Sequence, residues 1–272
     1  MKILFFCPLW GNADIPISEF VSKVKNAGYD GVELSLSMDK RERETTVSAI
    51  RNAGLLYLGQ HWETLTVDLE EHKREYTERL YNLAKGNPIL IDSQTGKDFF
   101  TFEQNMELVN AASAFTNETG IPVVHETHRG KFSFAAHITR QFLEANPELR
   151  IGADFSHWFN VAETMLENQE EARNIAISRA DHIHARVGFQ EGPQIPDPRA
   201  PEWKEVVETH ISWWDRILKR AKKEDRDCFT ISPEFGPFPY MTMLPYTKEP
   251  IADQWEVNVY MKDMLKNRFK MY

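Results

Sequence analysis

The sequence has few cysteines and no long hydrophobic run. Cys7 and Cys228 are its two cysteines among 272 residues, too few for a disulfide framework and compatible with a reducing compartment. Each lies in an apolar run, so we expect both thiols to pack in the core. No apolar stretch reaches the roughly 20 residues of a membrane-spanning helix. The chain is therefore predicted to have no membrane partner, and a cytoplasmic location is the default expectation.

Positive charge is also scarce. The chain has 32 Lys and Arg against 41 Asp and Glu, with a formal net charge of −9. Nucleic acids and anionic membranes attract basic surfaces, so neither is an expected partner. The apolar stretch of residues 2–10 contains Pro8 and lacks a small-residue cleavage site, so we interpret it as a first strand and not as a signal peptide.

Several catalytic signatures are missing. The sequence has no phosphate-binding P-loop, no Ser or Cys in a nucleophile elbow and no zinc-finger spacing. Nucleotide hydrolysis and covalent nucleophilic catalysis are thus poorly supported. The loop after the first apolar run, PLWGNADIP, has one glycine, whereas a doubly wound nucleotide-binding sheet has a glycine-rich loop there.

The chain does contain a regular alternation of short apolar runs and segments with helical spacing. The runs are residues 2–10, 29–36, 55–62, 88–94, 121–127, 150–157, 180–187 and 229–235. Between them, stripes such as Ile17, Phe20 and Val24 indicate amphipathic helices, and Gly28 fits a helix end. Eight such alternations predict the α/β class and a (β/α)8 TIM barrel, as a single domain over residues 1–272.

Three local features refine this prediction. Thr101 and Gln104 have the spacing of a capping box, and a last helix is expected from about Ala252. Long Pro- and Gly-containing loops, residues 188–201 and 236–250, follow the seventh and eighth runs. Barrel active sites form on that face. We interpret these loops as a semi-rigid lid with aromatic lining; plain surface insertions are the alternative.

Four successive runs end in side chains that bind metals: Glu126, Asp154, His184 and Glu234. Parallel barrel strands direct their carboxyl ends toward one cavity, so these groups are expected to meet. Without a cation, three carboxylates so close would repel one another. We predict one divalent metal ion held by these four residues; the oxygen-rich set favours Mn²⁺, and Mg²⁺, Co²⁺ and Zn²⁺ are compatible.

The neighbouring imidazoles leave alternatives open. His182 and His184 share one strand face, so either is a candidate ligand, and His184 is preferred because it is nearer the strand end. His157, in the spacing Asp-x-x-His, is either a further ligand or a hydrogen-bond donor to substrate. Arg186 binds a substrate oxygen or forms a surface ion pair.

Other polar and aromatic residues fall at the same barrel end. By alternation His128 shares the face of Glu126, whereas His125 points away and is expected to be structural; Glu33 is not expected to touch substrate. Trp10 either walls a pocket or packs in the core. The predicted substrate-binding residues are His157, Arg186, His128, His61, Gln94 and Trp10.

The stretches GYDGVELS, HETHRG, DFSHW, HIHARVG and SPEFGP, in this order, resemble the xylose isomerase-like barrel superfamily of sugar and sugar-phosphate isomerases and epimerases. The resemblance covers the whole barrel. In the ketose 3-epimerase branch it places the metal on Glu126, Asp154, His184 and Glu234, and His157 on substrate. Where that branch has a second substrate-binding glutamate, this chain has Phe132.

This resemblance implies a metal-dependent sugar or sugar-phosphate isomerase or epimerase. Its mechanism would be proton abstraction next to a carbonyl through a metal-stabilised enediolate, with Glu126 and Glu234 as base and acid. The partner would be a small sugar or polyol. The alternatives are a phosphodiesterase or endonuclease of the same superfamily, a dehydratase using the same enediolate, and a non-catalytic sugar-binding barrel. Trp213 and Trp214 indicate either a homo-oligomer contact or core packing.

Overall fold

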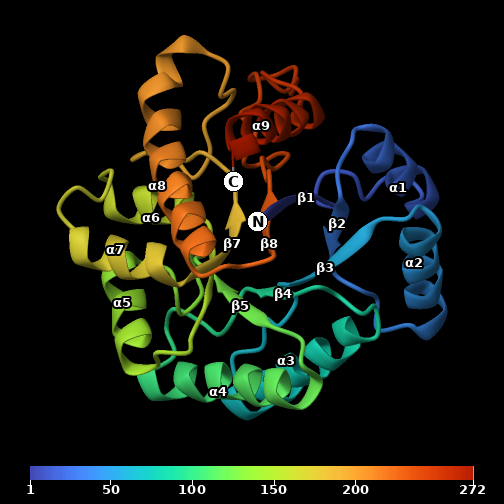
Figure 1. The fold of residues 1–272 in the computed structure, drawn as a ribbon, viewed down its shortest axis with the longest axis vertical. Coiled ribbons are helices and arrows are strands. Elements are labelled where there is room, and N and C mark those ends of the chain that lie inside the picture. Colours follow the sequence, from blue (N-terminus) through green and yellow to red (C-terminus); the bar gives the residue numbers. More distant parts are fainter. Residues whose placement is uncertain (272) are drawn as a thin grey trace.

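The computed structural model describes residues 1–271, which form a closed barrel of eight parallel strands (Figure 1). Neighbours in sequence are neighbours in the sheet, and β8 closes the barrel against β1. This confirms the predicted (β/α)8 fold. The strands are β1 (Lys2–Pro8), β2 (Gly31–Leu34), β3 (Leu56–His61), β4 (Ile91–Ser93), β5 (Val123–Glu126), β6 (Ile151–Ala153), β7 (Ala180–His184) and β8 (Cys228–Ser232).

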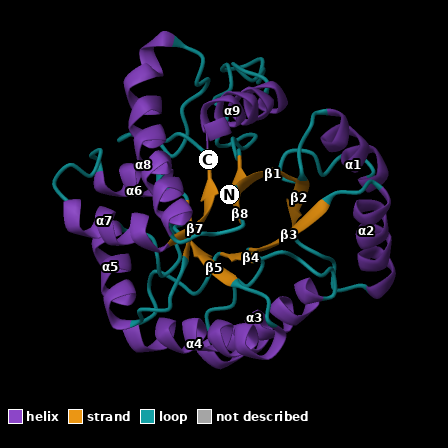
Figure 2. Cartoon of the chain, in the orientation of Figure 1, coloured by secondary structure: helices purple, strands orange, loops and turns teal. Residues whose placement is uncertain are grey.

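The helices surround this ring of strands (Figure 2). They are α1 (Ile17–Asn26), α2 (Lys40–Asn52), α3 (Leu69–Ala84), α4 (Phe102–Thr119), α5 (Ala136–Ala145), α6 (Ser156–Ala162), α7 (Glu170–Arg179), α8 (Lys204–Lys223) and α9 (Gln254–Arg268). Both α6 and α7 lie between β6 and β7, which adds one helix to the simple alternation. Short 3-10 helices span Pro201–Trp203 and Phe269–Met271. No helix within residues 1–271 is both long and apolar enough to cross a membrane.

Local sequence explains where the helices form. The α1 stripe buries Phe20 and Val24 against the barrel, as the apolar spacing predicts. The capping box at the start of α4 is confirmed. The backbone N–H of Gln104 donates to Thr101 Oγ1 at 3.2 Å, and the backbone N–H of Thr101 donates to Gln104 Oε1 at 2.9 Å.

Alternation along the strands divides the barrel lumen into two parts. A small apolar cluster closes one part; it consists of Leu4, Phe6, Leu58, Leu90 and Val124. On β3, β4 and β5 the next inward residues, two positions further along, are polar: Gln60, Asp92 and Glu126. The lumen therefore changes from apolar to charged toward the carboxyl ends of the strands.

Two expectations about packing need correction. Cys7 is buried, but Cys228 is exposed at the first position of β8, so its prediction as a packing residue is wrong. Trp213 and Trp214 are buried on α8, and the Trp213 ring lies 5.2 Å from that of Phe155. Core packing is therefore their role, and they offer no surface to a second copy.

The capping box yields a stability prediction. Replacing Thr101 by Ala removes the acceptor for the Gln104 N–H and should lower the free energy of unfolding by about 1 kcal/mol, measured by urea denaturation. Thr45→Ala, within α2, is the control and should cause no loss, because it removes no cap. Equal losses in both variants would contradict this account of the α4 terminus.

Candidate metal centre

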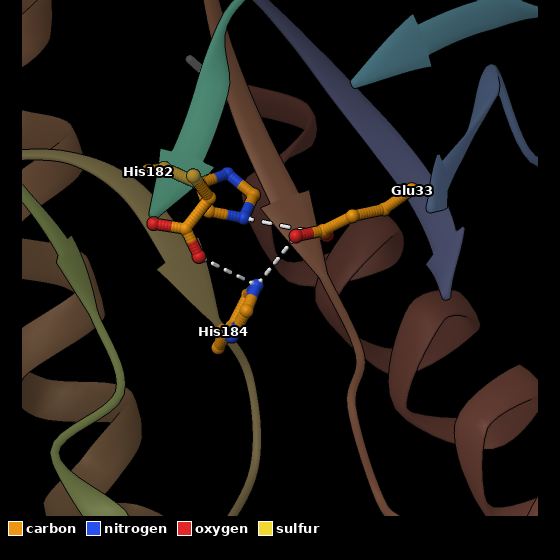
Figure 3. A group of neighbouring side chains, drawn as sticks. Glu33, His182 and His184 are labelled. Atoms are coloured by element: carbon orange, nitrogen blue, oxygen red, sulfur yellow. Dashed lines mark hydrogen bonds and ion pairs between the residues drawn. The ribbon is translucent and has the colours of Figure 1, made fainter. Parts of the chain in front are cut away.

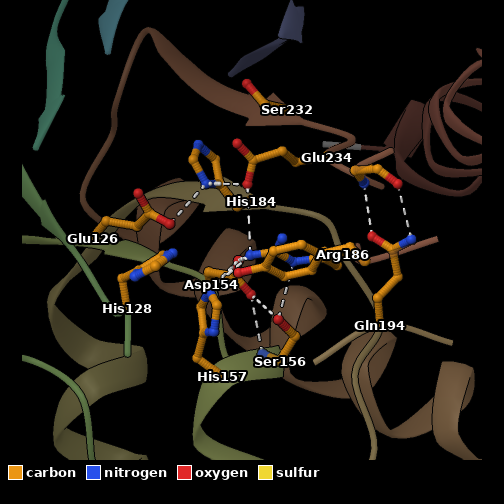
Figure 4. A network of polar contacts seen from close by, with 12 residues as sticks. Glu126, His128, Asp154, Ser156, His157, His184, Arg186, Gln194, Ser232 and Glu234 are labelled. Carbon is orange, nitrogen blue, oxygen red and sulfur yellow. Dashed lines mark hydrogen bonds and ion pairs between the residues drawn. The ribbon is translucent and has the colours of Figure 1, made fainter. Parts of the chain in front are cut away.

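His184 lies between two groups of buried acids at the end of β7. Its Nε2 is 2.8 Å from Glu33 Oε1 and 3.2 Å from Asp92 Oδ2, on the side shown in Figure 3. Its Nδ1 is 2.9 Å from Glu234 Oε2 and 3.5 Å from Glu126 Oε1, on the side shown in Figure 4. One imidazole thus contacts four carboxylates, supplied by four other segments of the barrel.

We call the second side the outer group: Glu126, Asp154, His184 and Glu234. These are the four ligands expected from the strand ends, and they offer one ligand atom each within 4.8 Å of one another. All four side chains are buried. The expected convergence of β5, β6, β7 and β8 on one point is therefore present in the fold.

The outer group fits a divalent cation. Both carboxylate oxygens of Glu126 are buried and have no hydrogen-bond partner among the described residues. An unpaired buried carboxylate is strongly unfavourable, by several kcal/mol in real proteins. Three carboxylates and one imidazole form a donor set that Mn²⁺, Mg²⁺ or Zn²⁺ accepts. A cation bound here would satisfy the Glu126 oxygens.

Arg186 is buried in the wall of this centre, so the surface ion-pair alternative is wrong. Its Nη2 pairs with Asp154 and lies 2.8 Å from His157 Nε2, while its Nε donates to Ser156 Oγ at 3.2 Å. Ser156 in turn donates to Asp154 through its backbone N–H at 3.1 Å. Arg186 Nη1 has no hydrogen-bond partner within the described chain, which leaves this donor free for a ligand.

A cavity of about 400 Å³ opens above the outer group. Its lining includes Trp10, Gln60, Gln94, Glu126, His128, Arg186, Glu234 and Tyr240. The predicted pocket residues Trp10, Gln94, His128 and Arg186 are thus brought together. A cavity of this size matches a small-molecule ligand.

The loop after β8 forms an aromatic wall of the cavity. The Tyr240 ring meets the Trp10 ring edge-on at 5.0 Å, and the Arg186 guanidinium lies 4.6 Å from the Tyr240 centroid. Gly236 lets Trp10 approach, since a Cβ there would lie 2.1 Å from the indole. Gln194 joins the two long loops by hydrogen bonds to both the N–H and the carbonyl of Gly236. Of the two long loops, the one after β8 thus lines the cavity, through Tyr240.

The structure places His61 away from the cavity. Its ring nitrogens lie 3.0 Å from Ser93 Oγ and 2.7 Å from Thr64 Oγ1, so both are satisfied in the barrel wall. The preceding residue, Gln60, faces the lumen and donates to Glu234 Oε1 at 3.1 Å. The expected position of His61 in the pocket is therefore wrong, and Gln60 lines the cavity instead, because a shift of one residue reverses the face of a strand.

The other imidazoles take the orientations expected from alternation. His125 points out of the lumen, with its Nδ1 2.7 Å from Thr95 Oγ1, as a structural residue does. His128 lines the cavity, and its ring lies 4.0 Å from that of His157. Burial lowers the pKa of both His128 and His157.

Three buried residues on the other side of His184 were not expected from the sequence to form a cluster. We call Glu33, Asp92 and His182 the inner group; they come from β2, β4 and β7. Glu33 was expected to be away from substrate, and it does lie beyond His184, outside the cavity lining. Period-two alternation places all three in the lumen, and that signal could have found Asp92, two residues before Gln94.

The side chains around His184 shift one another's pKa values. Burial raises the pKa of Glu126, but nearby His128 and His184 outweigh burial and lower it to about 2. Burial raises the pKa of Glu234 above its usual value, against the opposing effect of His184. Burial disfavours the charged form of His184, but Glu234 and the other carboxylates around it outweigh that and raise its pKa. The pKa values of Glu126 and Glu234 are therefore shifted in opposite directions.

No family model and no curated protein matches the sequence. Solved structures match the whole chain. The probable 3-DHS dehydratase of petrobactin synthesis from Bacillus anthracis has a TM-score of 0.60 at 18% identity, covering 98% of this chain and 100% of that one. The 3-keto-D-glucoside 4-epimerase from E. coli has a TM-score of 0.61 at 16% identity, covering 98% and 99%. Endonuclease IV from Thermus thermophilus has a TM-score of 0.58 at 12% identity, covering 98% and 100%.

Other matched structures are described as xylose isomerase domain proteins or as a sugar phosphate isomerase/epimerase. Identities this low bear on the fold and not on the activity. The resemblance read from the strand-end motifs is thereby confirmed for the architecture: this chain has the fold of the xylose isomerase-like TIM barrels.

Proposed function

We propose that this chain is a metal-dependent isomerase or epimerase of a small sugar or polyol, acting by proton transfer at a carbon next to a carbonyl. One observation carries the proposal: Glu126 and Glu234 both border the same cavity and both contact His184 Nδ1. Two carboxylates with opposite proton preferences beside one bound substrate are the arrangement that acid–base chemistry at carbon requires.

The outer group would hold the metal. Glu126, Asp154, His184 and Glu234 are its ligands in this proposal, and Mn²⁺ is the favoured ion for a set dominated by oxygen. When bound, a divalent cation stabilises the negative charge of an enediolate.

The two glutamates divide the proton transfer. Glu126, whose pKa is lowered by the charged groups around it, is the base that removes the proton in this proposal. Glu234, whose pKa burial raises, is the acid that returns it. Gln60 holds the Glu234 side chain by donating to its Oε1 at 3.1 Å. Return of a proton to the opposite face of the same carbon gives epimerisation, and return to the adjacent carbon gives isomerisation.

The remaining cavity residues would bind and orient the substrate. Arg186 Nη1 is a buried donor available to a hydroxyl or carbonyl oxygen. Gln94 and His128 add polar groups, and Trp10 offers an apolar face for the C–H side of a sugar ring. His157 acts through Arg186, to which it is hydrogen-bonded, and supports its orientation.

The endonuclease alternative is less well supported. His61 would be an additional zinc ligand in such a centre, but its two nitrogens are already hydrogen-bonded outside the cavity. The net charge of −9 also disfavours a DNA backbone. Dehydration remains a close relative of the proposed reaction, since it begins with the same removal of a proton beside a carbonyl.

Metal binding should stabilise the chain. At roughly 100 times Kd, Mn²⁺ should raise the free energy of unfolding by about 2.7 kcal/mol per site, seen as a higher Tm in calorimetry. Glu126→Gln should remove most of the increase due to the outer group. Asp181→Asn is the control: it changes a half-buried carboxylate at the opposite end of β7 and should keep the full increase. Equal Tm increases in wild type, Glu126→Gln and Asp181→Asn would show that the outer group is not the binding site.

Loss of either glutamate should abolish turnover. The Mn²⁺-loaded protein, incubated in deuterated water with a panel of ketopentoses, ketohexoses, inososes and hydroxypyruvate, should exchange a C–H proton of at least one compound, followed by NMR. Glu234→Gln and Glu126→Gln should each slow conversion at least about 100-fold, since each removes a proton-transfer group. Asp181→Asn should stay active. Ligand binding without exchange across the panel would instead support a non-catalytic sugar-binding barrel.

A further inference from the structure

The inner group has no task in the proposed reaction, although it is buried in the centre of the barrel. Glu33, Asp92 and His182 are each 0% exposed. Together with His184 they offer ligand atoms within 4.8 Å of one another. Figure 3 shows the Glu33 carboxylate and the His182 ring converging beside His184. Buried acids and an imidazole in such a position call for a compensating partner.

Several atoms of the inner group lack that partner. Both carboxylate oxygens of Asp92 and the Nε2 of His182 are buried without a hydrogen bond to any described residue. The closest nitrogen to Asp92, His184 Nε2, is already bonded to Glu33 at 2.8 Å. These unpaired atoms point into the group.

The tautomer of His182 follows from its other nitrogen. Nδ1 lies 3.1 Å from the carbonyl oxygen of Thr230 and 2.7 Å from its Oγ1. A carbonyl only accepts, so in the tautomer with the proton on Nδ1 the Nε2 presents a lone pair. That lone pair faces Glu33 Oε2 at 3.6 Å. A cation between these two atoms would contact both, and a Nδ1–H held by a backbone carbonyl is typical of a metal-binding histidine.

The barrel also makes room for Asp92. Gly152 is the lumen-facing residue of β6 opposite it, and a Cβ on Gly152 would lie 2.2 Å from Asp92 Oδ1. The absence of that one methyl group is what admits the carboxylate.

One cation in the outer group would not reach every buried carboxylate of this centre. Five buried carboxylates border His184 and Arg186: those of Glu33, Asp92, Glu126, Asp154 and Glu234. Arg186 pairs with Asp154, and a cation in the outer group would contact Glu126, Asp154 and Glu234. Glu33 and Asp92 lie on the other side of His184, where a second cation would compensate their carboxylates.

We propose that Glu33, Asp92 and His182 bind a second divalent transition-metal ion, such as Mn²⁺ or Zn²⁺, on the inner side of His184. The His184 ring lies between the two ions, with Nδ1 toward the outer group and Nε2 hydrogen-bonded to Glu33. This centre goes beyond the proposed function, which uses the outer group alone. Its ligands, two carboxylates and one imidazole, suit such an ion.

Metal counting tests the proposal. Wild-type protein saturated with Mn²⁺ and then desalted should contain two ions per chain by elemental analysis. Asp92→Asn should contain one, held by the outer group, and Glu126→Gln should contain one, held by the inner group. His182→Gln is a second inner variant for the case that Asp92→Asn does not fold. His125→Gln is its matched control: this buried imidazole points out of the lumen, so two ions should remain.

A second measurement, on the wild-type protein, tests whether two metal ions bind close together. Two Mn²⁺ ions on either side of one imidazole should give a spin-coupled electron paramagnetic resonance signal at full loading, replaced by an uncoupled signal at one equivalent. One ion per wild-type chain with no coupling would overturn the proposal, and would assign the neutralising role to a proton on Asp92. Two ions that persist in both Asp92→Asn and His182→Gln would overturn it as well, because the second ion would then lie elsewhere.

These outcomes are separable from those of the proposed function. Two ions per chain without carbon–hydrogen exchange would leave the inner site in place and remove the isomerase proposal. Carbon–hydrogen exchange by a protein that holds a single ion, unchanged by His182→Gln, would support the isomerase proposal and remove the inner site.

Discussion

The structure depends on how a closed barrel accommodates negative charge in its lumen. Glu33, Asp92, Glu126, Asp154 and Glu234 are all nearly inaccessible to water. Each unpaired buried ion costs several kcal/mol, so the fold is favourable only if cations or protons compensate. Arg186 and His184 provide part of that compensation from within the chain. The remainder is the physical reason for expecting divalent cations.

The same charge makes the cavity chemically useful. The apolar cluster that includes Leu4 and Val124 closes the lumen on one side of the cavity. Trp10 and Tyr240 line the cavity on the other side. Between these layers the dielectric is low, so differences in environment separate the proton affinities of Glu126 and Glu234 strongly. Stability and proton transfer are thus two consequences of one buried acidic layer, and variants that neutralise its members affect both.

Sequence reasoning succeeded where a pattern is local. The short apolar runs predicted the strands, and the apolar stripes predicted helices such as α1. The Thr101–Gln104 spacing predicted the start of α4. It failed where one position decides orientation. His61 and Gln60 are adjacent, and only the register of β3 shows that Gln60 enters the lumen. Cys228 was misjudged similarly, because the first residue of a strand can lie at the exposed end of the barrel.

Strand-end chemistry and eight β/α alternations were sufficient to predict the barrel and the meeting of Glu126, Asp154, His184 and Glu234. In a parallel barrel the direction of every strand is the same, so equivalent sequence positions become equivalent spatial positions. Alternation could have placed the residues of the inner group in the lumen, but tertiary structure decided that they meet. Glu33 and His182 are separated by most of the chain, and their contact depends on barrel closure and on the space left by Gly152 for Asp92. Such distances and clearances arise from packing between strands, which no local pattern encodes.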